Sequence, residues 1–139
     1  MPQYVSTHGT DWNHCSLQIA ASGVTIQGLD ISHQSGPGTG RDLVGEGYSG
    51  TPQSDWTLQN CKVHWAKRGV RTNGSNVSIL DCEFYDLHNE QVRIESASSF
   101  TVKGNWFHDS SYIGSGTAAV WVRGNSCAVG TTSDVSFNY

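Results

Sequence analysis

A short pattern of apolar and hydroxyl side chains recurs along the chain and constrains its fold more than any other feature. Each copy has an apolar residue, a Ser or Thr, a second apolar residue, a two-residue step and then another apolar pair. Copies begin at Val24, Trp56, Val77, Phe100 and, incompletely, Val135. Other alternating segments lie between the copies, at residues 17–19, 43–44, 70–72, 92–94 and 120–122. Because alternation with a period of two is typical of strands, each repeat holds three short strands.

A repeat of about 22 residues cannot bury its apolar side alone, so stacked copies must share one continuous core. The pattern therefore predicts an all-β fold, a right-handed parallel β-helix forming a single-stranded solenoid of about four to five coils. The main alternative is a β-sandwich, which also has many short strands. Against it, the hairpin signals Asn-Gly and Asp-Gly are nearly absent, and the one Asn-Gly pair, at 73–74, falls where a coil corner is expected.

The composition agrees with this fold and excludes several classes of partner. Gly, Ser, Thr and Asn supply 53 of the 139 residues, whereas the strong helix formers Leu and Ala supply only 13. The net charge is −4 and no block of five like charges occurs, so nothing attracts a nucleic acid or an anionic membrane. No apolar run approaches the ~20 residues that span a bilayer. We therefore expect neither nucleic acid nor membrane as a partner.

We expect residues 1–13 to form an N-terminal lead-in segment and residues 14–139 to form one β-helix domain. The last repeat stops soon after it begins, so we interpret the domain as a fragment or as open-ended. A β-helix presents unpaired strand edges at its ends, and such edges favour pairing with another chain. The expected assembly is a homo-oligomer or an end-to-end stack.

The coil corners are predicted at the two-residue steps 27–28, 59–60, 80–81 and 103–104. The residues after these corners should stack as one interior column, composed of Leu29, Cys61, Cys82 and Asn105. In that column Asn105 would be a buried amide bonded to turn backbone. Cys61 and Cys82 would be neighbours, either as stacked thiols or as a disulfide, and thiols are favoured because unpaired Cys is commonly buried.

Arginine and tryptophan side chains gather on the outward face of the second strand type. Across the coils the expected columns are Gln18, Val44, Arg71, Arg93 and Trp121, and then Ala20, Glu46, Asn73, Glu95 and Arg123. Arg pairs bidentately with carboxylates, and Trp offers a flat surface for a sugar ring. Arg71, Asn73 and Trp121 are therefore candidates for binding an acidic polysaccharide. The alternative is that Arg71 and Arg93 pair with Glu95 and Glu90 to relieve stacked like charge.

Three segments, GVTIQGLDIS, SNVSILDCEF and SSFTVKGNWF, resemble the coil motif of the pectate-lyase-like β-helix superfamily. The resemblance extends over roughly residues 17–139 and implies the β-helix fold. Many members of that superfamily are secreted and act on acidic polysaccharides as lyases, hydrolases or epimerases, and others are tailspikes or adhesins. The resemblance therefore implies a secreted or extracellular protein.

A narrower resemblance concerns alginate lyases and chondroitinase B. The run Glu90-Gln-Val-Arg-Ile-Glu-Ser96 is similar to a Glu-containing strand of that family, and Arg123-Gly-Asn is similar to its Arg-His-Gly motif. The resemblance implies that Arg123 is the catalytic arginine and that Glu90 is a calcium ligand. Glu95 stands where the family carries Lys. With Arg93 beside it, the catalytic candidates are Arg123, Arg93 and Glu95.

Two further groups carry acid–base side chains. Asp86, His88 and Glu90 alternate, so they are candidates for a small acid–base or metal group, in which Asp86 and Glu90 would bind Ca²⁺. Another strand type carries the outward column Ser32, His64, Tyr85 and His108, and His108 need not meet Asp109 beside it in sequence. The leading hypothesis is a carbohydrate-active module that binds, or cleaves by β-elimination, an acidic polysaccharide. The contrasting hypothesis is a non-catalytic assembly module that stacks end to end.

Overall fold

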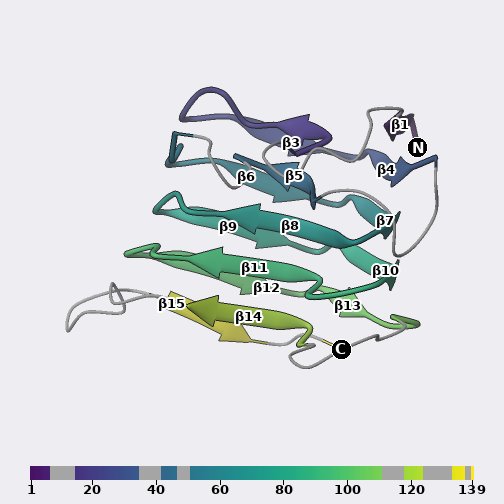
Figure 1. Cartoon of the computed structure of the whole chain (residues 1–139). Helices are drawn as coiled ribbons and strands as arrows, with labels where there is room; N and C mark the ends of the chain where they lie inside the picture. Colours follow the sequence, from purple (N-terminus) through teal and green to yellow (C-terminus); the bar gives the residue numbers. More distant parts are fainter. Residues whose placement is uncertain (7–14, 35–41, 47–50, 111–117, 124–132, 137–138) are drawn as a thin grey trace.

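The computed structural model describes residues 1–6, 15–34, 42–46, 51–110, 118–123, 133–136 and 139, and every regular element in these ranges is a strand. Figure 1 shows the strands in successive levels from the purple N-terminal part to the yellow C-terminal part. The described strands are β1 (Gln3–Ser6), β2 (Leu17–Gln18), β3 (Thr25–Gln27), β4 (Asp30–His33), β5 (Asp42–Gly45), β6 (Thr57–Gln59), β7 (Lys62–Ala66), β8 (Arg68–Thr72), β9 (Val77–Leu80), β10 (Glu83–Leu87), β11 (Val92–Glu95), β12 (Phe100–Lys103), β13 (Trp106–Phe107), β14 (Val120–Arg123) and β15 (Ser133–Ser136).

The strands form three parallel sheets, and the chain visits the sheets in turn. Sheet A has the order β1-β4-β7-β10-β13, sheet B the order β2-β5-β8-β11-β14, and sheet C the order β3-β6-β9-β12-β15. All strand pairings among the described residues are parallel, as between β7 and β10 or β8 and β11. The predicted parallel β-helix is therefore confirmed. No helix in the described ranges is long and apolar enough to cross a membrane.

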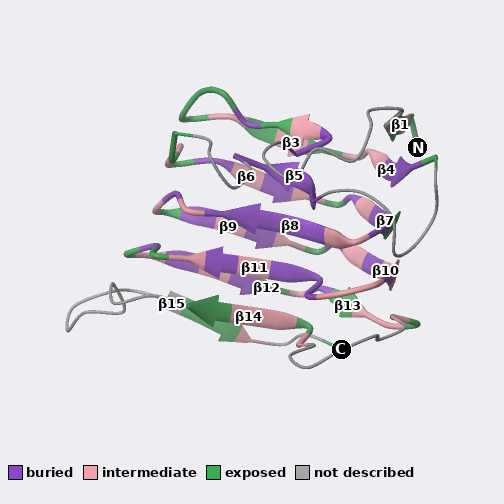
Figure 2. Ribbon diagram, in the orientation of Figure 1, coloured by how far each residue is buried: buried purple, intermediate pink, exposed green. Residues whose placement is uncertain are grey.

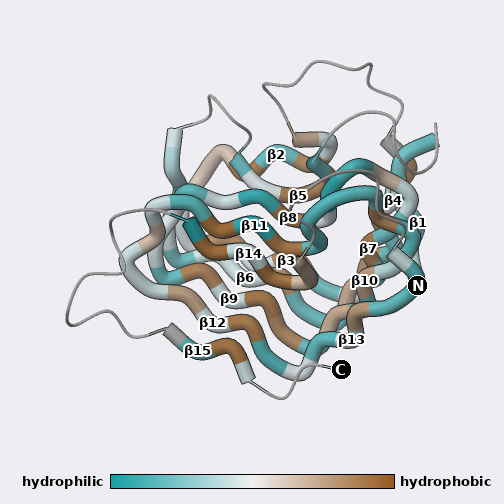
Figure 3. The backbone as a smooth tube through the Cα atoms, turned by 60° about the horizontal axis from the view of Figure 1, so that its bottom comes forward, coloured by the Kyte–Doolittle hydropathy of each residue, from teal (hydrophilic) through white to brown (hydrophobic). Residues whose placement is uncertain are grey.

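The core runs along the axis of the coils, between the three sheets. On β9, Val77 and Ile79 are buried while Ser78 and Leu80 are only half-buried, as period-two alternation requires. Figure 2 shows the buried residues concentrated in the middle coils, and Figure 3 shows apolar residues recurring at equivalent places of successive coils. Trp56 and Phe84 are the largest fully buried side chains.

The corners between sheets C and A fall where the repeat predicts them. Gly28, Asn60, Asp81 and Gly104 all have positive φ, at 68°, 51°, 52° and 72°. Gly adopts this left-handed conformation without steric cost, and Asn and Asp tolerate it better than other side chains. At Gly104 a Cβ atom would lie 2.2 Å from Asp81 Oδ1, so the corner also needs glycine for space.

The strand register agrees with the predicted interior column. Asp30, Lys62, Glu83 and Trp106 are in register across four neighbouring strands. The residues just before them therefore lie at equivalent places of successive coils, and these are Leu29, Cys61, Cys82 and Asn105. Asn105 is fully buried, as predicted: its Nδ2 donates to Ile79 O at 3.0 Å, and its Oδ1 accepts from Cys82 N at 2.9 Å. Cys61 and Cys82 are buried free thiols, which is the favoured alternative. The buried amide thus ties one coil to the next.

Two predicted registers are wrong. In sheet B, the predicted outward column places Val44 beside Arg71. In the structure Gly45 pairs with Arg71, and Val44 pairs with Leu17, so Val44 points inward. Adjacent Leu43 and Val44 are both fully buried, which breaks the alternation on which the register was counted. In sheet C, Phe100 pairs with Ser133, two residues before the predicted Val135.

The lead-in segment contributes to the fold, because β1 pairs with β4 from Gln3–Asp30 to Ser6–His33. The predicted boundary at residues 13 and 14 lies outside the described residues.

Candidate functional site

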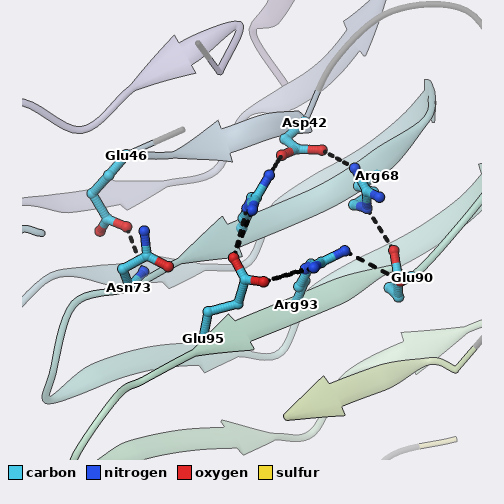
Figure 4. A network of polar contacts seen from close by, with 8 residues as sticks. Asp42, Glu46, Arg68, Asn73, Glu90, Arg93 and Glu95 are labelled. Carbon is cyan, nitrogen blue, oxygen red and sulfur yellow. Dashed lines mark hydrogen bonds and ion pairs between the residues drawn. The ribbon is translucent and has the colours of Figure 1, made fainter. Parts of the chain in front are cut away.

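The outward face of sheet B carries a closed network of six charged side chains, which we call the ion-pair ring (Figure 4). Three carboxylates and three guanidinium groups alternate around it, so its formal charges cancel. Its members, in order around the ring, are Asp42, Arg68, Glu90, Arg93, Glu95 and Arg71.

Each carboxylate of the ion-pair ring bridges two arginines. Asp42 Oδ1 lies 3.1 Å from Arg68 Nη1, and its Oδ2 lies 3.5 Å from Arg71 Nη1. The ring continues from Arg68 Nε to Glu90 Oε2 at 2.5 Å, and from Glu90 Oε1 to Arg93 Nη1 at 3.5 Å. Glu95 closes the ring, because its Oε1 accepts from Arg93 Nη2 and its Oε2 from Arg71 Nη2, both at 2.6 Å.

Burial makes these pairs interact more strongly than surface pairs do, because the side chains are only 6–15% exposed. Burial opposes the charged form of Glu95, but hydrogen bonds from Arg71 and Arg93 outweigh it, so the pKa of Glu95 lies below its ordinary value. Burial likewise opposes the charge of Arg68, but the pKa of Arg68 is raised because Asp42 and Glu90 favour the cation. Both pKa shifts favour the charged forms of Glu95 and Arg68.

Close approach of adjacent coils determines where the ring can form. Gly45 has φ 140°, and a Cβ atom there would lie 1.7 Å from Arg71 O. At Gly69 a Cβ atom would lie 2.5 Å from Gln91 O. Glycine at these positions lets β5, β8 and β11 stack closely, which brings the Arg71 and Arg93 side chains into register on neighbouring strands.

Trp121 and Arg123 on β14 extend the ring toward the next coil, since Trp121 is in register with Arg93 and Arg123 with Glu95. The Arg93 guanidinium carbon lies 4.1 Å from the Trp121 ring centroid, and that of Arg123 lies 5.8 Å from it. Arg93 thereby links the ring to Trp121 by a cation–π contact. Arg123 is exposed and forms no ion pair with another described residue.

The structure brings five of the predicted site residues together in or against the ring, with Arg123 beside Trp121, but not as an open arginine patch. Arg71 is only 5% exposed, and it and Arg93 pair with Glu95 and Glu90, which is the alternative weighed for them. Arg71, Arg93, Glu90 and Glu95 all belong to the ion-pair ring, and Trp121 lies against it.

Glu46 and Asn73 lie apart from this face, just past the ends of β5 and β8. Glu46 is buried rather than outward, because the corrected register places it beside Thr72. Its Oε1 accepts from Trp56 Nε1 at 2.8 Å and from Thr72 Oγ1 at 3.1 Å, and its Oε2 accepts from Asn73 N at 2.9 Å. Asn73 therefore contributes its backbone to a buried corner (Figure 4).

The two predicted calcium ligands lie on different parts of the coil. Asp86 is on β10 in sheet A, whereas Glu90 lies just before β11 and pairs with Arg68 and Arg93. In the described ranges, no group of three or more His, Cys, Asp or Glu side chains could hold a metal ion. Calcium at Asp86 and Glu90 stays a prediction.

Sequence reasoning missed Asp42 and Arg68, although a signal for them exists. Asp42 pairs with Arg68 in register, and each lies two residues before the buried valine of its strand, as Glu90 does before Val92. Counting back from Val44, Val70 and Val92 gives a column of alternating charge. The predicted register placed Val44 beside Arg71 instead of Val70, and so moved Asp42 out of line with Arg68.

The comparisons with known proteins bear on the fold. No curated protein and no solved structure matches the chain. The family described as right-handed β-helix region matches residues 46–138, about two thirds of the chain. This range includes most of the coils described above and five of the six members of the ion-pair ring. The chain therefore belongs to the right-handed β-helix family, and its coils have the predicted hand.

Proposed function

We propose that this chain is a carbohydrate-binding β-helix domain that holds an acidic polysaccharide on sheet B without cleaving it. One observation carries the proposal: exposed Arg123 lies beside the Trp121 ring, next to a neutral, already paired set of charges. Arg123 would bind a sugar carboxylate through its planar guanidinium group, and Trp121 would contact the sugar ring. The resemblance to polysaccharide-active β-helix proteins supports the same ligand class and a location outside the cell.

The ion-pair ring favours a supporting role for Arg71 and Arg93 over direct ligand binding. A sugar carboxylate would have to displace Glu95 from both arginines, and Glu95 already contacts each of them at 2.6 Å. Such an exchange leaves an unpaired charge in a partly buried place, which is costly. The ring instead fixes Arg93 beneath Trp121 and so orients the aromatic ring.

The surroundings of Glu95 argue against β-elimination. A general base must have a free lone pair and a pKa near the working pH. Both oxygens of Glu95 accept hydrogen bonds from arginine, and its pKa is lowered further from neutrality. Glu95 also replaces the Lys of the lyase motif that this segment resembles. These features support binding rather than cleavage.

Isothermal titration of the chain with polygalacturonate, alginate and chondroitin sulfate tests the proposal. We expect at least one of the three to bind, and Arg123→Ala to weaken that binding by about tenfold, the effect of losing a charged hydrogen bond. Trp121→Ala should weaken it similarly. The matched control is Lys103→Ala, which removes one exposed positive charge from sheet C and should leave affinity unchanged.

Three results would overturn the proposal. They are the absence of binding to all three polymers, equal losses in Arg123→Ala and Lys103→Ala, and accumulation of an unsaturated product that absorbs in the ultraviolet. The last result would assign cleavage to the chain.

A further inference from the structure

A continuous stack of aromatic rings lies on the outward face of sheet A, far around the coil from the ion-pair ring. Ser32, His64 and Tyr85 are in register, and His108 follows β13 at the same level of the column. The His64 and Tyr85 centroids are 4.4 Å apart with an interplanar angle of 7°, and those of Tyr85 and His108 are 5.3 Å apart at 10°. Trp106 stacks on His108 at 4.0 Å.

Carboxylates on neighbouring positions hold the imidazole rings in this stack. His64 Nε2 lies 2.7 Å from Asp30 Oδ1. His108 Nδ1 lies 2.8 Å from Asp109 Oδ2, so these sequence neighbours do meet, and its Nε2 lies 3.2 Å from Glu83 Oε1. Asp109 reaches back because its φ is 47°, which turns the chain after His108. The imidazole rings are thus fixed before any ligand arrives.

Two tryptophans expose flat apolar surface beside this stack. Trp106 is 52% exposed, and Trp65, which meets His64 edge-on, is 48% exposed. They belong to β13 and β7, which are separated by two coil steps in sheet A, about 10 Å along the axis. The Tyr85 hydroxyl and both indole N–H groups make no hydrogen bond to another described residue. The face therefore offers ring surfaces and unused donors at neighbouring places.

Most charges on this face are already paired with one another, and Asp86 on β10 has no ion-pair partner among the described residues. Lys62 Nζ lies 2.8 Å from Glu83 Oε2, and each imidazole has a carboxylate partner. An anionic ligand would have to displace one of these carboxylates, whereas an uncharged polyhydroxylated ligand would not. Aromatic rings with polar edges suit the apolar faces and hydroxyl groups of sugar rings.

We infer that sheet A carries a second binding surface, formed by Trp65, Tyr85 and Trp106, for a neutral oligosaccharide lying along the axis of the coils. In Figure 1 the strands β7, β10 and β13 that carry it descend one side of the molecule in consecutive levels. Trp106 and Trp65 contact sugar rings toward the two ends of the surface, and the Tyr85 hydroxyl donates a hydrogen bond between them. This surface is separate from the sheet B site for acidic polysaccharides.

Titration of the full chain with four neutral hexaoses tests the inference, with β-1,4-linked glucose, xylose and N-acetylglucosamine and α-1,4-linked glucose as probes. We expect at least one probe to bind and to change tryptophan fluorescence. Trp106→Ala should weaken binding at least about tenfold, and Tyr85→Phe about fivefold, the effect of one neutral hydrogen bond. Trp106→Phe, which keeps a ring, should retain most of the affinity.

Trp121→Ala on sheet B is the matched control, and it should leave neutral-probe affinity unchanged. Because Trp106 is half exposed, its removal leaves the core packed, and unchanged thermal unfolding of the variant checks this. The inference is overturned if none of the four probes binds, if Trp106→Ala binds as tightly as the wild type, or if only Trp121→Ala loses affinity. The sheet B proposal is tested separately with the acidic polymers. If their binding is lost in Arg123→Ala and kept in Trp106→Ala, that proposal holds even when the sheet A inference fails.

Discussion

Single side chains in this β-helix satisfy polar groups that the stacking of coils would otherwise leave buried and unpaired. Glu46 is 1% exposed, yet three donors from Trp56, Thr72 and the Asn73 backbone reach its two oxygens. Asn105 plays the same part at another corner, with one bond to Cys82 N and one to Ile79 O. A buried acceptor without such partners costs about 1–3 kcal/mol. These residues therefore connect neighbouring coils through the core.

His108 makes stability depend on pH. A hydrogen bond to Asp109 raises the pKa of His108 above its ordinary 6.5, burial opposes this slightly, and Glu83 adds to the rise. A raised folded-state pKa means that the stabilisation is complete below 6.5 and is lost as the pH rises through the folded value. Urea unfolding of the wild type and of His108→Gln should therefore differ most near pH 6, with the wild type more stable.

The difference between wild type and His108→Gln should shrink steadily toward pH 9. His33→Gln, whose site is not in this stack, is the comparison variant for a general effect of losing a histidine. A difference that is constant with pH would contradict the role given to the His108 pairs.

At the scale of strands, the ion-pair ring depends on three neighbouring elements at once. β5, β8 and β11 lie in register, and the ring pairs side chains from all three or from the residues just before them. Removing one carboxylate leaves two guanidinium groups less compensated. In partly buried surroundings that loss costs more than the loss of an exposed pair.

Glu95→Gln should lower the free energy of unfolding by about 1–3 kcal/mol at pH 7, because two hydrogen-bonded charge pairs are weakened. The pKa of Glu95 is depressed, so its contribution is present above the ordinary 4.5 and is lost as the pH falls through the folded value. Urea unfolding at pH 7 and pH 3 measures both. Lys62→Ala, which removes a pair whose lysine is 44% exposed, should cost clearly less than Glu95→Gln, because solvent screens an exposed pair. Equal costs in the two variants would contradict the special strength of the ring.

The strand pattern let the sequence predict most of the elements, since alternation is a local property of the chain. The corners at Asn60 and Asp81 were predicted from the two-residue step of the repeat, which is also a local property. Both residues have positive φ, which Asn and Asp tolerate. The register of β5 was not predicted, because Leu43 and Val44 are both buried and Gly45, rather than Val44, pairs with Arg71. The sequence indicates the pairing of the arginines with Glu90 and Glu95, but closure into a ring needs Asp42, which only the correct register brings into place.

For the whole molecule, the stacking of coils determines which surfaces can meet another copy. Among the described strands, β1, β2 and β3 at one end and β13, β14 and β15 at the other each have one hydrogen-bonded neighbour. At β13 the outer edge is already bonded within the chain, because Phe107 N donates to Tyr139 O at 2.6 Å and Tyr139 N donates to Asn105 O at 2.9 Å. The outer edges of β14 and β15 have donors and acceptors that a second copy can pair with. Exposed Val122 and Val135 lie on the strands at the second end. End-to-end association therefore stays a prediction at this scale.

Light scattering coupled to size exclusion tests that association. We expect the average mass to rise above the 15.1 kDa of one chain as the concentration increases. Val135→Lys, which places a charge on the edge strand β15, should lower the average mass, whereas Thr101→Lys on the internal strand β12 should not. A mass of one chain at every concentration would contradict association.

The alternation of charge in the column Asp42, Arg68, Glu90 favours one order of the three coils that carry these residues. Coils of similar length and apolar pattern are geometrically interchangeable, so packing alone does not distinguish a correct sequence of coils from one in which a coil is skipped. If the coil of Arg68 were skipped, Asp42 would stand against Glu90, and two carboxylates would face each other without a cation. Like-charge contact of this kind raises the free energy of the wrong arrangement. The residues that neutralise the face therefore also disfavour a wrong order of these coils.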